Sequence, residues 1–280
     1  MTGPESGAPV SPLGRLRSLR SGRVRRVIGG IVAVLLLAAV GTVLFSAPDL
    51  LREARAAIAG AGFGLIALFV LLPVLNLLAV TGGFVVLTRR VGQVGGIEMF
   101  ALLSSAWLLN YLPMRPGMIG RTVYHKTVNG IAVPDGVLVL AWGSGLSLAA
   151  GFMMGVSALP GALGIGGKTA ALAFLLAPVL LALLGLGACT VAKRGAWRTP
   201  AALLFKQLDM LVWAIRYDVA FDLVGRPIGI EAAALIAAIS QATLLVPITG
   251  NGLGLREWAV GLLAWRGGFG RDAGLLADVL

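Results

Sequence analysis

Long apolar segments, separated by short polar ones, make up most of the chain. Uninterrupted hydrophobic runs occupy residues 27–47, 60–88, 137–158 and 169–192. An α-helix needs about 20 predominantly apolar residues to cross the hydrocarbon core of a bilayer, and each run is long enough. Membrane β-barrels are excluded, because their strands are segments of about 10 residues with alternating hydrophobicity. The pattern predicts an all-α, polytopic helical membrane protein.

Composition and charge agree with this class. Of the 280 residues, 58% are hydrophobic and only 12% are charged, which is too apolar for a soluble domain. The net charge is +11, but the basic residues cluster at the ends of apolar runs, where positive charge orients membrane helices. We therefore expect no nucleic-acid partner. The single cysteine, Cys189, and the single histidine, His125, leave too few ligands for a disulfide or a zinc site, so we expect no metal.

Arginines crowd the segment before the first apolar run and indicate the orientation of the chain. We interpret residues 1–24, rich in Pro, Gly, Ser and Arg, as a disordered basic tail in the cytoplasm, and residues 25–280 as one transmembrane domain. A cleaved signal peptide is the rival interpretation, but the run 27–47 is long enough to be an uncleaved first span. Basic clusters also follow the second and fourth runs. They lie in the cytoplasm if residues 98–130 enter the membrane and return, or cross it an even number of times.

Two segments, residues 101–126 and 234–260, share a pattern that breaks a helix. Each begins as an apolar stretch and then reaches a proline, a glycine seven positions later and an arginine, at Pro113, Gly120 and Arg121 in the first and at Pro247, Gly254 and Arg256 in the second. Proline removes a backbone donor, and each interior glycine costs a helix about 1 kcal/mol. The pattern predicts two broken or re-entrant helical segments and favours an internal repeat.

The broken segments also predict the kind of site. Freed backbone groups cannot face lipid, and an arginine at mid-bilayer costs about 2.5–3.5 kcal/mol on insertion scales. Both costs are avoided if the segments line a polar groove, whose N–H and guanidinium groups would bind an anion, above all phosphate. The expected substrate-binding residues are Arg121, Arg256, Arg115, Asn110, Glu257, Asn251 and Thr249. The residues expected to break the helices and shape the groove are Pro113, Gly117, Gly120, Pro247, Gly250, Gly252 and Gly254.

Some charged residues have more than one interpretation. Arg256 and Glu257, followed by Trp258, are also typical of a helix end anchored at the membrane surface. Within residues 201–227, a helix would place one set of charges on one side and a second set nearly opposite, namely Lys206, Asp209 and Arg216 against Asp218, Asp222 and Arg226. This pattern predicts a bent helix or one that lines a polar cavity, with Asp222 and Arg226 at pairing distance.

One stretch comes close to a nucleotide-binding motif. Residues 162–169, ALGIGGKT, resemble the phosphate-binding loop G-x-x-x-x-G-K-[ST] but carry Ala162 in place of its first glycine. That loop binds nucleotides between a strand and a helix of a soluble sheet, whereas this stretch joins two apolar runs. We interpret it as a connector, and we expect no ATPase activity and no cofactor.

The two broken segments, NYLPMRPGMIGRTVYHK and VPITGNGLGLREWAV, resemble the signature regions of the lysylphosphatidylglycerol synthase transmembrane (flippase-like) family. The second is the more specific, with G-x-R-E at residues 254–257. The resemblance covers roughly residues 27–280 and implies a multi-pass protein of the bacterial or archaeal inner membrane. Family members are best known for moving aminoacylated phosphatidylglycerol between leaflets. Neither the soluble transferase domain nor the second membrane unit of the bifunctional members has a counterpart here, and we expect a final span after the G-x-R-E region to be missing.

These observations lead to three hypotheses. The first is translocation of an anionic or zwitterionic phospholipid, or of a related lipid-linked molecule, with membrane phospholipid as the partner. The second is a membrane-embedded transferase acting on lipid headgroups, for which the sequence offers only His125, Tyr124 or a few carboxylates as a base or nucleophile. The third is a non-catalytic scaffold for a soluble or membrane transferase.

Overall fold

The computed structural model describes residues 38, 41, 42, 45, 48–110, 116–163, 165, 168–191, 197–244 and 254–279. Within these ranges the regular structure is helical throughout, which confirms the all-α class. The predicted tail and nearly all of the first apolar run lie outside the described residues.

The other three apolar runs each form one long helix. They are α3 (Phe63–Thr88), α6 (Val133–Ala162) and α7 (Lys168–Val191), and the polar segment before α3 forms the helix α2 (Pro48–Gly60). In the described part of the chain, α3 and α6 are long and apolar enough to cross a bilayer, by length and composition alone. The stretch that resembles a nucleotide-binding loop falls between the end of α6 and the start of α7, with three of its residues outside the described set.

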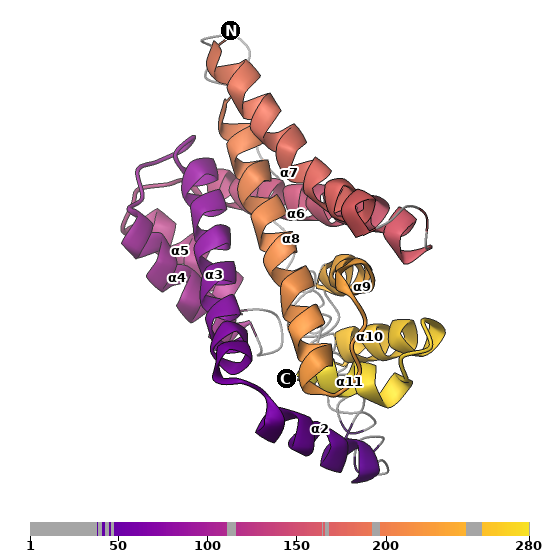
Figure 1. Ribbon diagram of the computed structural model, residues 1–280. Helices are drawn as coiled ribbons and strands as arrows, with labels where there is room; N and C mark the ends of the chain where they lie inside the picture. The colour runs from indigo at the N-terminus through magenta and orange to yellow at the C-terminus, as the bar shows by residue number, and fades with distance from the viewer. Residues whose placement is uncertain are drawn as a thin grey trace, which may run out of the picture.

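Helix α8 (Arg198–Leu223) lies at the centre of the molecule. It packs along α3 and also contacts α2, α6, α7, α9 and α11, so that most other helices are arranged around it (Figure 1). The segment 201–227 thus forms one helix as far as Leu223. Of its charged residues, Lys206 and Asp209 are buried, Arg216 and Asp218 are half-buried, and Asp222 and Arg226 are exposed. The two buried charges agree with the predicted alternative in which this helix lines a polar cavity.

Each of the two proline- and glycine-containing segments forms two helices rather than one. The first gives α4 (Gly96–Leu109) and α5 (Pro116–Thr127), and the second gives α9 (Ile230–Thr243) and α10 (Leu255–Arg266), followed by α11 (Arg271–Val279). The two helices of each pair pack against each other. The residues between the helices of each pair, 111–115 and 245–253, lie outside the described residues. The predicted interruption of both segments is confirmed at the level of helix boundaries.

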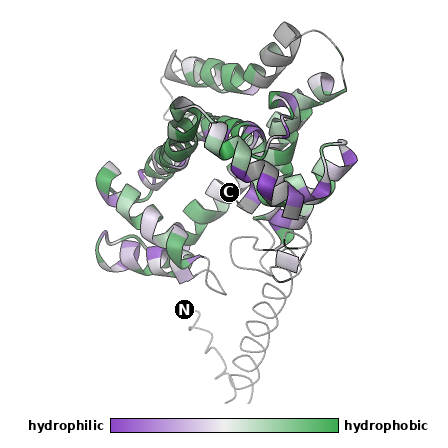
Figure 2. Ribbon diagram, turned by 60° about the horizontal axis from the view of Figure 1, so that its bottom comes forward, coloured by the Kyte–Doolittle hydropathy of each residue, from purple (hydrophilic) through white to green (hydrophobic). Residues whose placement is uncertain are grey.

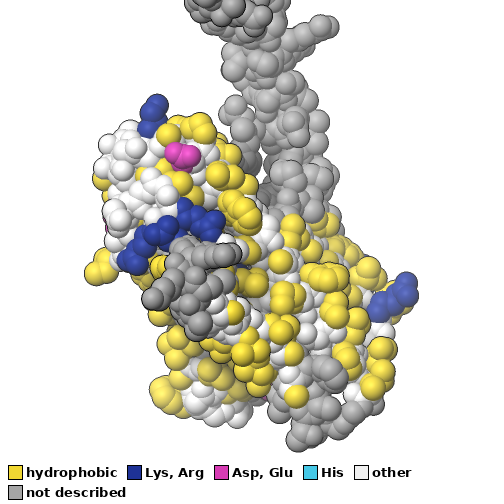
Figure 3. Space-filling view, turned by 90° about the horizontal axis from the view of Figure 1, so that it is seen from above, with side chains coloured by type: hydrophobic (Ala, Val, Ile, Leu, Met, Phe, Trp, Pro, Cys, Tyr) yellow, Lys and Arg dark blue, Asp and Glu magenta, His cyan; other side chains and the backbone are white. Residues whose placement is uncertain are grey.

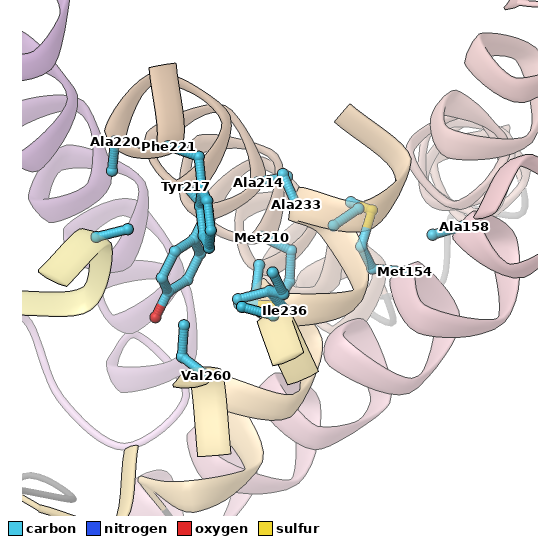
Figure 4. Packing of buried hydrophobic residues seen from close by; sticks show 14 of the residues in the cluster. Met154, Ala158, Met210, Ala214, Tyr217, Ala220, Phe221, Ala233, Ile236 and Val260 are labelled. Atoms are coloured by element: carbon cyan, nitrogen blue, oxygen red, sulfur yellow. The ribbon is translucent and has the colours of Figure 1, made fainter. Parts of the chain in front are cut away.

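Small side chains allow the central helices to approach closely. The largest buried cluster joins α6, α8, α9, α10 and α11 and consists mainly of alanines around a few large side chains, among them Met154, Met210, Phe221 and Ile236 (Figure 4). Tyr217 enters the same cluster from α8 and carries its hydroxyl group toward α9 and α11. This packing fixes the position of the α9–α10 pair against α8.

The surface of the helices is largely apolar. Only 22% of the most apolar window of α3, and 28% of that of α6, is buried inside the protein. Hydrophobic residues colour most of the long helices in Figure 2 and cover much of the described surface in Figure 3. Phe63, Leu108, Phe152 and Leu184 are among the large exposed side chains. An apolar surface of this extent is unusual for a monomer in water.

Gly117 controls how closely α5 approaches α4. A Cβ at this position would lie 2.2 Å from the carbonyl oxygen of Ala106, whereas a Cβ at Gly120, three residues later, would meet nothing within 4 Å. We expect Gly117→Ala to destabilise the protein by about 1–3 kcal/mol, because backbone atoms must shift to admit the methyl group. Gly120→Ala should be neutral or slightly stabilising, since alanine favours a helix. Thermal unfolding in detergent measures both, and equal melting temperatures for the two variants would contradict this account.

Candidate functional site

Arg121 is held inside the protein by an aromatic ring rather than by a carboxylate. Its side chain is only 7% exposed, and its guanidinium carbon lies 4.0 Å from the ring centroid of Phe84 on α3. Cations over aromatic faces are attracted by about 0.5–2 kcal/mol, more when water is excluded. Within the described part of the chain, no acidic side chain forms an ion pair with Arg121. Arg121 is therefore a buried cation without a counter-ion there.

A second cation lies on the same ring. The Nζ atom of Lys206, on α8, is 5.3 Å from the centroid of Phe84 and 3.7 Å from Oδ2 of Asp209, one helical turn away. The amide of Asn76, on α3, donates a hydrogen bond to Oδ1 of Asp209. Lys206, Asp209 and Asn76 are all buried. Two cations thus lie over one ring but only Lys206 is paired with a carboxylate, and with all three groups ionised the cluster carries one surplus positive charge.

A small cavity and two buried polar atoms without partners lie next to α5. The cavity, of about 10 Å³, has room for one water and is lined by Thr88, Arg121, Thr122 and His125 together with residues of α6 and of the segments that follow α3 and precede α6. The Oγ1 atom of Thr88 and the Oδ1 atom of Asn110, the latter beside Gly117, are buried without a hydrogen-bond partner among the described residues. Buried polar groups in proteins are normally satisfied. Because Thr88 lines the cavity, its hydroxyl group is suited to bind a water or another polar molecule there.

Hydrogen bonds join the outer ends of α4 and α5. The Nδ2 atom of Asn129 donates to Oε1 of Glu98 at 2.8 Å, and His125 Nδ1 lies 3.0 Å from Oδ1 of Asn129. The hydrogen bond from Asn129 lowers the pKa of Glu98, because it favours the charged carboxylate. His125 is in this way tied to the end of the helix pair, which orients its ring toward the cavity next to Arg121.

Arg256 has a different environment from Arg121. Its Nε donates to Oδ2 of Asp278, on α11, at 2.9 Å, and its Nη2 lies 3.7 Å from Oε1 of Glu257. Asp278 also accepts a hydrogen bond from the hydroxyl of Tyr217. The charge of Arg256 is therefore already compensated, and a phosphate would have to displace Asp278 to reach it. Arg256 is 13% and Glu257 3% exposed, so other parts of the protein enclose both side chains. The alternative in which this pair marks the membrane surface stays a prediction.

Helix α8 links the two broken segments. Lys206, Asp209, Trp213 and Tyr217 follow one another at spacings of three, four and four residues, which places them on one face of the helix. Arg121 meets this face through the ring shared with Lys206, and the guanidinium of Arg256 lies 5.9 Å from the ring of Trp213. The cavity lined by Arg121 does not include Arg256. Both segments thus approach the same face of α8, at levels two helical turns apart.

The other predicted site residues divide into two groups. Seven lie outside the described residues, namely Arg115, Asn251, Thr249, Pro113, Pro247, Gly250 and Gly252. Of the rest, Gly117 permits the close contact with α4, Gly120 borders open space, and Gly254 begins α10 with a φ of 81°, a conformation that favours glycine. The substrate-binding and groove-shaping roles expected for both groups stay predictions.

Sequence reasoning did not single out several residues of the site. Phe84, Asn76, Tyr217 and Asp278 contact the predicted charges from other helices, and nothing in their local sequence marks them. Lys206 and Asp209 were singled out, because two opposite charges three residues apart in an apolar helix form a pair that can be buried. No protein-family model matches the chain, and no curated protein matches it.

The buried ion pair between Lys206 and Asp209 on α8 is expected to contribute to the stability of the protein. Asp209→Asn leaves Lys206 and Arg121 together without a compensating charge, and breaking a buried pair on one side costs about 3–5 kcal/mol. We expect a correspondingly lower melting temperature in detergent. Asp222→Asn, an exposed change of the same kind on the same helix, should have little effect.

Removing both charges of the pair provides the control for this prediction. The double variant Lys206→Met/Asp209→Leu should recover much of the stability lost in Asp209→Asn, because it removes the buried lysine that Asp209→Asn leaves unpaired. If Asp209→Asn and Asp222→Asn unfold at the same temperature, the ion pair between Lys206 and Asp209 does not make the contribution to stability that we assign to it.

Proposed function

We propose that this protein is an integral membrane protein that carries the phosphate-bearing headgroup of a lipid between the leaflets of a bilayer. The observation that supports it is Arg121, a buried guanidinium with no carboxylate partner among the described residues. A buried cation is costly unless an anion compensates it. Such a group is suited to an anionic substrate that enters and leaves.

The apolar surface supports a location in the membrane. A core helix of a soluble protein is mostly buried, whereas α3 and α6 leave most of their apolar windows uncovered. Water makes such exposure unfavourable by roughly 25 cal/mol per Å² of apolar surface, but lipid tails do not. We propose a multi-pass protein of the inner or plasma membrane with its N-terminus in the cytoplasm, as the arginines before the first apolar run predict.

The charge of the cluster indicates which headgroups would fit. Arg121 and Lys206 together carry two positive charges against one negative charge on Asp209, which leaves one charge to be balanced. A phosphodiester carries one negative charge and supplies acceptor oxygens for the guanidinium. Thr88 would add a hydroxyl donor, and the free Oδ1 of Asn110 would accept from an amino or hydroxyl group of the headgroup.

Such a site would lower the barrier to lipid movement by replacing water. Moving an ionic headgroup through hydrocarbon costs tens of kcal/mol by Born solvation. A protein route that supplies a cation and hydrogen-bond donors removes most of this cost, while the acyl tails stay in lipid. The cavity beside Arg121 has room for about one water, so a headgroup requires α5 to move away from α6. The resemblance of the two broken segments to the flippase-like family agrees with this function.

The transferase and scaffold hypotheses have less support. His125 lies beside Arg121, but its ring nitrogen contacts Asn129, and the cavity it lines is too small for a headgroup together with a second substrate. No observation among the described residues identifies a partner protein. Lipid translocation is therefore the function that the geometry supports best.

Reconstitution into liposomes tests this function. Vesicles containing a fluorescent phosphatidylglycerol and the protein should exchange this lipid between leaflets faster than empty vesicles, as read by chemical quenching of the outer leaflet. We expect Arg121→Gln to reduce the rate at least 10-fold, since a lost charge-assisted contact of about 1.5–3 kcal/mol corresponds to roughly 10- to 100-fold.

The matched control is Arg89→Gln, which removes an exposed arginine at the end of α3. It should leave the rate unchanged, and both variants should keep the wild-type melting temperature within a few degrees. Equal exchange rates for Arg121→Gln and wild type, or no exchange above that of empty vesicles, would reject the proposed function.

A further inference from the structure

A second polar cluster lies where α8, α9, α10 and α11 meet. Tyr217 donates its hydroxyl proton toward Asp278 and lies 2.7 Å from the hydroxyl of Ser240. Arg256 contacts Asp278 through Nε and Glu257 through Nη2. The cluster is distinct from the Arg121 site, and the proposed function does not use its carboxylates.

The two carboxyl groups of this cluster are not equivalent. Both oxygens of Asp278 accept hydrogen bonds, Oδ1 from Tyr217 and Oδ2 from Arg256 at 2.9 Å. Glu257 has Oε1 3.7 Å from the guanidinium and the backbone N–H groups of Gly254 and of Glu257 itself near its carboxyl group, but its Oε2 is buried without a partner among the described residues. Asp278 thus has a partner on each oxygen, whereas one oxygen of Glu257, which is 3% exposed, has none.

Charge balance leads to the same distinction. Arg256 is the cation in ion-pair contact with both acids, so two ionised carboxylates would leave one buried negative charge. Arg216, on α8, lies over the same ring of Trp213 as Arg256, 5.0 Å from its centroid, but the ion pair that Glu257 forms among the described residues is with Arg256. Tyr217 on α8 and Ser240 on α9 are neutral hydroxyls here, and Arg271 of α11 is exposed and lies over the ring of Trp258, 4.5 Å from its centroid. One bound proton removes the imbalance.

We propose that Glu257 is a proton-binding site, protonated at neutral pH while Asp278 stays ionised against Arg256. The proton is taken from water, so that carboxylate and hydronium become carboxylic acid and water. The free Oε2 is where the proton is held, since the other oxygen faces the guanidinium. Two acids beside one cation form a coupled pair, whose first proton binds far more tightly than its second.

A simpler interpretation is that Glu257 is an ionised glutamate in the first turn of α10. Carboxylates are favoured at helix N-termini by the helix dipole, by about 0.3–1 kcal/mol at exposed positions. That effect is smaller than the cost of burying an unpaired carboxylate oxygen. The simpler interpretation predicts an ionised Glu257 at neutral pH, and the two accounts can be separated by experiment.

Helix α8 connects the proton-binding site to the Arg121 cluster. Lys206 and Tyr217 are 11 residues apart on one face of α8, which is about 16 Å along the helix at 1.5 Å per residue. Loss of the proton from Glu257 would weaken the hold of Asp278 on Arg256 and loosen α10 and α11 from α8. Any effect of that loosening on lipid movement rests on the proposed function, whereas the proton site itself does not.

Infrared spectroscopy of the full chain in detergent tests the proton site directly. A protonated carboxyl group gives a C=O stretching band that a carboxylate lacks. We expect the wild-type-minus-Glu257→Gln difference spectrum to contain one such band at pH 7, and the band to disappear as the pH is raised. Asp278→Asn should also lose the band at pH 7, because Glu257 then has Arg256 to itself and ionises.

Glu231→Gln, in the first turn of α9, is the matched control and should keep the band. A wild-type band that is absent at pH 7 would overturn the proposal, as would a band of full intensity in Glu257→Gln. Retention of the band in Asp278→Asn would overturn the inference that Glu257 and Asp278 compete for Arg256. Because the readout involves no lipid, failure here is distinguishable from failure of the leaflet-exchange experiment.

Discussion

A cation buried in an apolar protein must be compensated, and the manner of compensation differs between the two arginines that the broken segments carry. Arg256 has Asp278 at 2.9 Å. Arg121 lies on the face of Phe84, together with a lysine that is already paired with Asp209. The proposed function depends on the surplus positive charge at Arg121, because no anion among the described residues compensates this charge.

The uncompensated charge of Arg121 lies where α5 meets α4 and α6. Arg121 lies on a short helix that is packed against α4 through Gly117 and against α6 across a small cavity. Helix α5 packs against α4 and α6, whereas α9 and α10 enter the alanine-rich cluster around Tyr217. In the proposed function, α5 would be the element that admits a headgroup by moving away from α6.

Much of this arrangement follows from local sequence. Run length predicted α3, α6 and α7, and the proline and glycine positions predicted that residues 101–126 and 234–260 would each form two helices. The chemistry of arginine predicted that Arg121 would avoid lipid. Contacts between distant residues did not follow, since nothing near Asp278 indicates that it meets Arg256, and nothing near Phe84 indicates that it lies under Arg121. Such contacts are set by how helices pack, which depends on side chains from several elements at once.

The most direct test of the account is whether Arg121 holds a phosphate group. Native mass spectrometry of the protein, released from detergent with equal amounts of phosphatidylglycerol and diacylglycerol, measures this without any transport step. The account predicts that the wild type retains phosphatidylglycerol but not diacylglycerol, and that Arg121→Gln retains neither. Equal retention of phosphatidylglycerol by the wild type and Arg121→Gln would contradict it.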